Sequence, residues 1–181
     1  MKKVVLKVRL KGRDEFERKL ERLKIDLGQV FWEHDRVFVP RGYRRDCGFP
    51  RLVLRTEMRA VDRPPKYYLI LKRHIGDSNV EIEQKTAVKD YLEAVGIVQQ
   101  LGFVASSEVS RKRQEARTSG GERLFLDNID NNVGNYAKLE TEIREGEKTE
   151  EARKRLLEIF SRLREENFIY QSYAEMVKPK A

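Results

Sequence analysis

Alternation of charged and apolar residues recurs along this chain of 181 residues and constrains its fold more than any other feature. In the segments 80–85 and 137–143, every second residue is charged. Because successive side chains of a β-strand point to opposite faces, Glu81 and Glu83 share one face of a strand. The pattern therefore predicts strands with one charged face and one apolar face that packs against helices.

The same pattern predicts about eight short strands joined by tight turns, which favours an antiparallel sheet. Apolar residues at helical spacing separate some of these strands and predict helices. The length suits one domain, so we expect a single α+β domain over residues 1–181 with helices packed outside the sheet. The predicted strands are 3–11, 30–39, 52–55, 67–72, 80–83, 106–116, 123–129 and 136–143.

Caps and turns set the expected limits of the helices and hairpins. Thr86 is predicted to cap the second helix and Thr149 the third, because a hydroxyl can accept a hydrogen bond from the first helical turn. Turns are expected at 76–77, 119–121 and 131–134, where Gly, Asn and Asp gather. The helical residues predicted to face the core are Phe16, Leu20, Leu23, Leu27, Val88, Leu92, Val95, Val98, Leu156, Ile159, Phe160 and Leu163.

The charged strand faces admit two interpretations. Such a face is usually the solvated side of an antiparallel sheet. A sheet of about eight strands can also close into a barrel that encloses side chains or one small ligand. Basic side chains inside would suit a triphosphate, and carboxylates beside them would suit Mg²⁺ or Mn²⁺. The charged sets are Lys7, Arg9 and Lys11; Arg55, Glu57 and Arg59; Lys72; Glu81 and Glu83; Arg111 and Arg113; and Glu140 and Glu142.

Short motifs follow one another in an order that carries a family resemblance. They are Leu54-Arg55, Leu69-Ile70-Leu71-Lys72, Glu81-Ile82-Glu83, Leu101-Gly102-Phe103, Val109-Ser110-Arg111-Lys112-Arg113, Leu126-Asp127 with Gly134 to Glu140, and Gln171 to Val177. Each motif is weak alone. Their order over nearly the whole chain resembles the CYTH superfamily, the triphosphate tunnel enzymes, and within it the class IV adenylyl cyclase-like branch.

This resemblance implies an eight-stranded antiparallel tunnel that binds ATP or another organic or inorganic triphosphate. It assigns catalysis to Asp127 and Glu81, and binding of Mg²⁺ or Mn²⁺ to Glu81, Glu83 and Glu140. In the hydrolases of the family a metal-bound water attacks the terminal phosphate, whereas in the cyclases the ribose hydroxyl of ATP attacks the α-phosphate. The residues expected to contact triphosphate are Lys7, Arg9, Arg55, Lys72, Arg111 and Arg113.

The chain departs from the family pattern at positions expected to be charged differently. The family opens with Glu-x-Glu-x-Lys, and here Lys3 and Val5 stand at the two acidic positions. Lys138 replaces the first acid of the C-terminal pair, and Val53 stands where an arginine is expected. Exchanging acids for lysines disfavours a divalent cation there by charge repulsion, although the tunnel would still attract polyphosphate.

Three classes of function follow. The first is a metal-dependent triphosphate enzyme, either cyclase-like or a triphosphatase. The second is a non-catalytic module that binds polyphosphate or nucleotides. The third and least favoured is an RNA-binding protein, since residues 1–75 hold 21 basic and 10 acidic residues and basic surfaces neutralise phosphates. The family resemblance also makes a homodimer an expected assembly.

Composition indicates the cellular compartment and excludes some kinds of site. Cys47 is the only cysteine, so neither an intramolecular disulfide nor a cysteine-based zinc site can form. No apolar run approaches the roughly 18 residues that span a membrane, and the first residues enter a strand pattern without the apolar core of a signal peptide. We therefore expect a cytoplasmic protein. Its charged fraction of 38% resembles thermophile composition.

The histidines and aromatic residues carry less information. His34 and His74 have no cysteine or second histidine nearby in the sequence, so exposed or hydrogen-bonded roles are favoured over metal ligation. Phe31, Trp32 and Phe38 are expected to be core residues first and a platform for a nucleobase second.

Overall fold

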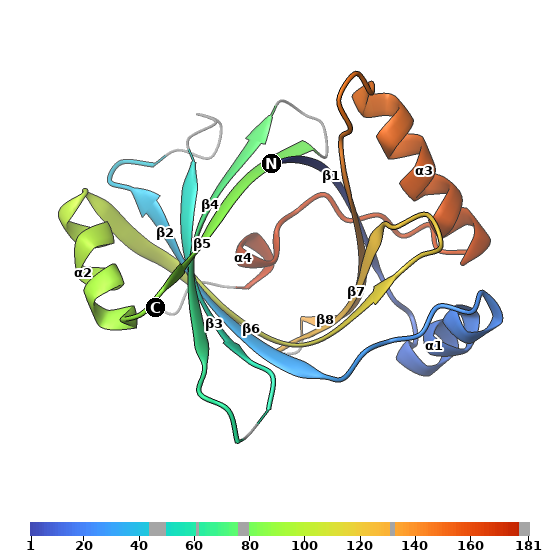
Figure 1. Ribbon diagram of the computed structural model, residues 1–181, viewed down its shortest axis with the longest axis horizontal. Coiled ribbons are helices and arrows are strands. Elements are labelled where there is room, and N and C mark those ends of the chain that lie inside the picture. Colours follow the sequence, from blue (N-terminus) through green and yellow to red (C-terminus); the bar gives the residue numbers. More distant parts are fainter. Residues whose placement is uncertain (44–49, 61, 76–79, 131–132, 178–181) are drawn as a thin grey trace.

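Eight antiparallel strands close into one barrel (Figure 1). The computed structural model describes residues 1–43, 50–60, 62–75, 80–130 and 133–177. Neighbouring strands follow the order β1-β5-β4-β3-β2-β6-β7-β8, and β8 pairs with β1 to close the ring. This confirms the predicted antiparallel tunnel. The strands are β1 (Lys2–Arg9), β2 (Phe31–Pro40), β3 (Arg51–Met58), β4 (Lys66–Ile75), β5 (Val80–Val88), β6 (Phe103–Arg117), β7 (Arg123–Ile129) and β8 (Gly134–Glu142).

The apolar faces of β1, β7 and β8 point outward and are covered by α1 (Arg13–Arg22) and α3 (Thr149–Arg162), as Figure 1 shows. Val4, Leu6 and Val8 alternate along β1 and are all buried against this layer. Because the outer faces bury their apolar residues under helices, the alternate residues of the same strands must point into the barrel. The alternation noted in the sequence therefore places the charged residues inside.

A second apolar layer lies on the opposite side of the barrel, under α2 (Tyr91–Gln100) (Figure 1). Phe38 of β2 and Leu54 of β3 are fully buried there against Val98 of the helix. This layer shields the outer faces of β2, β3 and β4, so both halves of the barrel wall are supported from outside. The rigid wall fixes the positions of the side chains that point inward.

The start of α2 differs from the prediction. Thr86 belongs to β5, where it pairs with Leu69 of β4, and does not cap the helix. Asp90 is the cap, since its carboxylate accepts a hydrogen bond from the backbone of Glu93 at 3.0 Å. An aspartate one residue before the helix satisfies the free N–H groups better than a threonine still held in a sheet ladder. Val88, predicted to be helical, consequently ends the strand.

Several side chains also lie elsewhere than predicted. Leu92 is 77% exposed, because α2 packs on the barrel through Ala94, Val95 and Val98 and Leu92 lies outside this face. Trp32 is 43% exposed on the outside of β2, where Lys112 lies 4.5 Å above its ring, whereas Phe31 and Phe38 are buried as expected. At α3, Lys148 is the cap and Thr149 is the first helical residue.

The remaining element predictions have mixed outcomes. The first helix ends at Arg22, so Leu23, expected in its stripe, is 37% exposed just after it. The hairpin turn at 119–121 is confirmed by the hydrogen bond from the Gly121 N–H to the Thr118 carbonyl. The predicted turn at 76–77 and part of that at 131–134 lie outside the described residues.

The C-terminal segment enters the barrel instead of covering its outer surface (Figure 1). It follows β1 first, where the Ile169 N–H donates to the Lys7 carbonyl at 2.8 Å. The short helix α4 (Tyr173–Met176) then lies inside the ring of strands, and Ala174 packs against inward-facing Val53 and Ile70. The chain's own C-terminal segment therefore occupies part of the barrel interior.

Candidate functional site in the barrel interior

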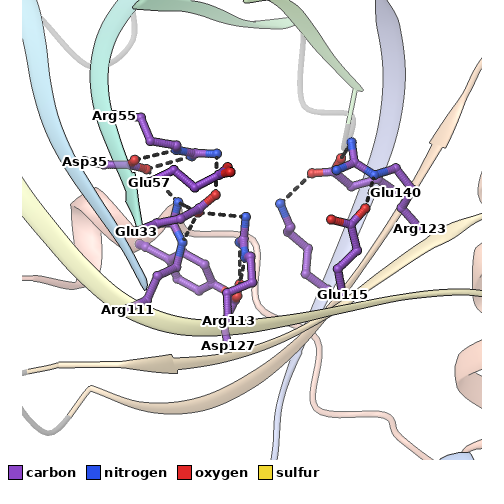
Figure 2. Close-up of polar contacts among 12 residues, drawn as sticks. Glu33, Asp35, Arg55, Glu57, Arg111, Arg113, Glu115, Arg123, Asp127 and Glu140 are labelled. Carbon is purple, nitrogen blue, oxygen red and sulfur yellow. Dashed lines mark hydrogen bonds and ion pairs between the residues drawn. The ribbon is translucent and has the colours of Figure 1, made fainter. Parts of the chain in front are cut away.

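Two clusters of charged residues fill the interior, and the first is built on arginines of β3 and β6 (Figure 2). Arg55 binds Asp35 through two hydrogen bonds of 2.6 and 2.8 Å. Arg111 bridges Glu33 and Asp35: it donates twice to one Glu33 oxygen, at 2.8 and 2.5 Å, and once to Asp35, at 2.8 Å. The planar guanidinium matches the two oxygens of a carboxylate, so these pairs are geometrically fixed as well as charged. We call Arg55, Arg111, Arg113, Glu33, Asp35 and Asp127 the arginine cluster.

The cluster continues from Arg113 to the C-terminal segment. Arg113 donates to both oxygens of Asp127 at 2.6 and 2.7 Å, and its other nitrogen lies 3.0 Å from Glu33. The Tyr173 hydroxyl donates to Asp127 at 2.8 Å. The fully buried Asp127 carboxylate thus accepts hydrogen bonds from one strand, β6, and from α4, which ties the C-terminal segment to the barrel wall.

The carboxylates of the arginine cluster are held ionised. Burial alone would raise the pKa of Glu33, but Arg113 and Arg111 hold that pKa well below its usual range. Burial acts in the same direction on Asp127, and Arg113 again keeps its pKa low. Buried ions of one sign are thus compensated by ions of the other sign, as burial of charge requires. The carboxylates act as acceptors here, not as proton donors.

The second cluster is built on lysines of β1, β4 and β8 with glutamates of β5 and β8. Lys3 Nζ lies 2.9 Å from Glu83 and 3.1 Å from Glu140. Lys72 Nζ lies 3.2 Å from Glu83 and 3.3 Å from Glu81. Lys138 contacts the second oxygen of Glu140. We call Lys3, Lys72, Lys138, Glu81, Glu83 and Glu140 the lysine cluster.

A cavity of about 130 Å³ lies between these clusters and the C-terminal segment. Its walls combine apolar side chains, among them Val37 and Val109, with cations of both clusters. Lys7 also lines it, donates to the Gln171 carbonyl and lies 4.4 Å from the centre of the Tyr173 ring. Burial lowers the pKa of Lys7 to about 7. Its ammonium has no ion pair with a carboxylate among the residues that the structure describes.

Most residues predicted for the site converge in the interior. Lys7, Arg55, Lys72, Arg111, Arg113 and Glu81 all line the cavity, and Glu83, Asp127 and Glu140 lie in the two clusters. Arg9 lies apart, because it is exposed at the end of β1 and lines a separate surface depression with Lys11 and Asn167.

Sequence reasoning missed the acidic residues of β2. Glu33 and Asp35 are buried partners of three arginines, yet the strand was interpreted only through its aromatic residues. The signal was present, since Phe31, Glu33, Asp35 and Val37 fall at alternate positions and so share one face. His34 and His74 are hydrogen-bonded to Ser110 and Arg51, as predicted.

The fold of this chain was compared with those of known proteins. No family model and no curated protein matches the chain. A solved structure from Pyrococcus horikoshii OT3 superposes with a TM-score of 0.82 at 20% identity, covering 96% of this chain and 97% of that one. One from Vibrio parahaemolyticus, described as a candidate adenylate cyclase, gives 0.78 at 18% identity and covers 96% of each. A Hippeastrum protein described as having a dominant triphosphatase activity gives 0.62 at 14% identity, covering 95% and 92%.

These identities show the fold alone, and the fold agrees with the closed barrel and its inward-facing charges. None of the described helices is long and apolar enough to cross a bilayer. Structures named for adenylate cyclase and for triphosphatase activity share the strand ring of this chain over nearly its whole length. The chain therefore shares the closed-barrel fold of these structures, the kind of fold that the resemblance in its sequence implied.

Proposed function

We propose that the chain binds a triphosphate-containing small molecule inside the barrel. The observation that carries the proposal is the convergence of basic side chains from five strands on one enclosed space, with Lys7, Arg55 and Arg111 among them. Arginine and lysine offer charge-assisted hydrogen bonds to phosphate oxygens, and a dry interior strengthens those bonds. The fold that the chain shares with proteins named for triphosphate chemistry supports the same ligand class.

Lys7 is the natural first contact for an anion in the cavity. Its ammonium has no ion pair with a described carboxylate, so an anion there competes with the neutral Gln171 carbonyl, and not with a carboxylate, for direct contact with Lys7. Burial disfavours the charged form of Lys7, whereas an anion beside it would favour that form. We therefore expect ligand binding to be coupled to proton uptake near neutral pH.

Binding beyond Lys7 requires an exchange of partners. Arg55 and Arg111 already hold Glu33 and Asp35, so phosphate oxygens must displace these carboxylates to reach the guanidinium groups. The cavity is also smaller than the roughly 300 Å³ of a small ligand pocket, so side chains or the segment 169–174 must move aside. The expected affinity is accordingly moderate, because the ligand competes with bonds that already exist.

A triphosphatase or adenylyl cyclase-like enzyme is the second candidate, favoured by the fold shared with the Hippeastrum protein. In it Glu81 and Asp127 would take the catalytic roles expected from the sequence. The buried position of Asp127 between Arg113 and Tyr173 fits a positioning role better than direct contact with water. RNA binding is less favoured, since Lys3 and Arg55 of the basic N-terminal half point inward, out of reach of a polymer.

Calorimetric titration with tripolyphosphate, ATP and thiamine triphosphate in the presence of chelator tests the binding proposal. Lys7→Met should weaken binding by at least about tenfold, equivalent to about 1.4 kcal/mol. Lys112→Met is the matched control, because Lys112 lies exposed on the outer face of the same barrel. If none of the three compounds binds, the proposal is refuted. Release of phosphate or pyrophosphate with Mg²⁺ or Mn²⁺ would instead establish the enzyme.

A further inference from the structure

A lysine ammonium occupies the centre of the acidic group expected to hold a metal. Lys3 Nζ lies between Glu83 Oε2 at 2.9 Å and Glu140 Oε2 at 3.1 Å, and the residue is 3% exposed. The register explains this position: Lys3 is the cross-strand partner of Glu81 on one side, and β1 joins β5 to β8. A lysine on this strand therefore points between the glutamates of both neighbours.

The charges of the lysine cluster are balanced without any added ion. Three ammonium groups face three carboxylates, and each carboxylate lies against at least one ammonium. Burial raises the pKa of Glu83, but Lys72 and Lys3 outweigh it and lower that pKa to about 2. Lys138 and Lys3 likewise keep the pKa of buried Glu140 low. The glutamates are thus ionised, and lysines already neutralise them.

Mg²⁺ or Mn²⁺ does not fit this arrangement. These ions require several oxygen ligands at about 2.0–2.2 Å in an open octahedral shell, and the two oxygens that face each other here already contact Lys3. A divalent ion entering beside three ammonium groups would add two uncompensated charges to a buried site. No group of three or more His, Cys, Asp or Glu side chains among the described residues could hold a metal ion.

We infer that Lys3 is a built-in cation that takes the place of a divalent metal, so that the barrel folds and keeps its acidic cluster without one. Glu83 and Glu140 then serve to anchor Lys3 and are not free metal ligands. One consequence depends on the proposed function: triphosphate should bind equally well in chelator and in Mn²⁺. The inference itself concerns the protein alone and can be tested without triphosphate.

The test is binding of Mn²⁺, measured from the loss of the electron paramagnetic resonance signal of the free ion, together with the melting temperature. The natural protein should bind no Mn²⁺ in its interior and show the same melting temperature in Mn²⁺ and in chelator. Lys3→Gln removes the ammonium between Glu83 and Glu140, which then keep Lys72 and Lys138, respectively, as ammonium partners. It should therefore lower the melting temperature in chelator and bind one Mn²⁺ at least about tenfold more tightly than the natural protein. Added Mn²⁺ should then restore part of the lost stability.

Lys19→Gln is the matched control, because Lys19 bridges Glu165 at 2.8 Å and Glu15 at 3.0 Å on the outside of the molecule. It frees two carboxylates without a buried enclosure and should gain no Mn²⁺ site. Equal Mn²⁺ binding by both variants, or none by Lys3→Gln, would overturn the inference. If Lys3→Gln does not fold, the measurement on the natural protein tests the inference. The inference is overturned if the natural protein binds one Mn²⁺ and Glu83→Gln abolishes that binding. It is supported if the natural protein binds no Mn²⁺.

The two proposals fail in distinguishable ways. A protein that binds neither Mn²⁺ nor triphosphate loses the proposed function and keeps the inference about Lys3. A protein that binds triphosphate and also holds Mn²⁺ at Glu83 keeps the function and loses the inference.

Discussion

The two charged clusters inside the barrel neutralise buried carboxylates in different ways. In the arginine cluster, Arg55 and Arg113 each hold a carboxylate through two parallel bonds, so direction as well as charge is fixed. In the lysine cluster, Lys3 and Lys72 act as point charges, each shared between two glutamates. Ammonium groups on flexible stems can change partners more easily than bidentate guanidinium groups. The comparison predicts a rigid half and an adaptable half of one interior.

The largest expected effect comes from breaking the rigid half. Asp127→Ala removes both oxygens that Arg113 binds through paired bonds and leaves the buried guanidinium with one carboxylate partner, Glu33, at 3.0 Å. We expect a loss of about 3–5 kcal/mol in the free energy of unfolding, measured by urea denaturation. The double variant Asp127→Leu/Arg113→Met should recover much of that loss because it removes both charges. A loss below 1 kcal/mol for the single variant would contradict the rigid model.

Breaking the adaptable half should cost less. Glu83→Gln removes one negative charge, yet Lys3 keeps Glu140 and Lys72 keeps Glu81. The Glu83 side chain is also 15% exposed, so solvent screens part of the change. We expect the free energy of unfolding, measured by urea denaturation, to fall by about 1.5–3 kcal/mol. A loss equal to or greater than that of Asp127→Ala would show that the two clusters do not differ as described.

The pH dependence of stability should come from the lysines and not from the arginines. Burial lowers the pKa of Lys7 to about 7 and that of Lys138 to about 8, below the ordinary value of 10.5. Between these values and 10.5 the unfolded chain binds more protons than the folded one, so stability should rise with pH across this window. One such group contributes up to about 1.4 kcal/mol per pH unit.

Urea denaturation at a series of pH values from 6.5 to about 9.5 would measure how steeply the free energy of unfolding rises with pH. Lys7→Met should flatten this slope, whereas Lys112→Met, on the outer face, should leave it unchanged. A stability that falls as pH rises through the window, or a slope untouched by Lys7→Met, would contradict the assignment.

The smallest expected effect concerns the bond between the arginine cluster and the C-terminal segment. Tyr173→Phe removes the hydroxyl that donates to Asp127 at 2.8 Å, while Arg113 continues to bind both oxygens of that carboxylate. The free energy of unfolding should fall by about 1 kcal/mol. Faster hydrogen exchange confined to residues 169–177 would show that this bond holds the segment in the barrel. Unchanged exchange there would mean that apolar packing of Ala174 suffices.

The candidate site was predictable to the extent that strand alternation sets the direction of a side chain. Arg55, Lys72 and Glu81 point inward because their strands bury Leu54, Leu71 and Val80 outward. The limits of α2 were less predictable, since Thr86 and Asp90 are both acceptable caps and only the pairing of Thr86 with Leu69 excludes the first. The position of Arg9 was also not predictable, because alternation gives the face on which a side chain lies but not where along the strand the barrel interior ends. Arg9 lies at the exposed end of β1.

The sequence by itself therefore determined the antiparallel strands, the alternation that gives them one charged face, and the residue types gathered on that face. Closure of the barrel made that face the inner one. Only the tertiary structure decided which charges pair. Closure of the barrel places β1 between β5 and β8, which brings Lys3 to Glu83 and Glu140, 80 and 137 residues away. It also places β2 between β3 and β6, where Asp35 and Glu33 meet Arg55 and Arg111. Ion pairing depends on distances of a few ångströms, and strand order, not sequence separation, sets those distances.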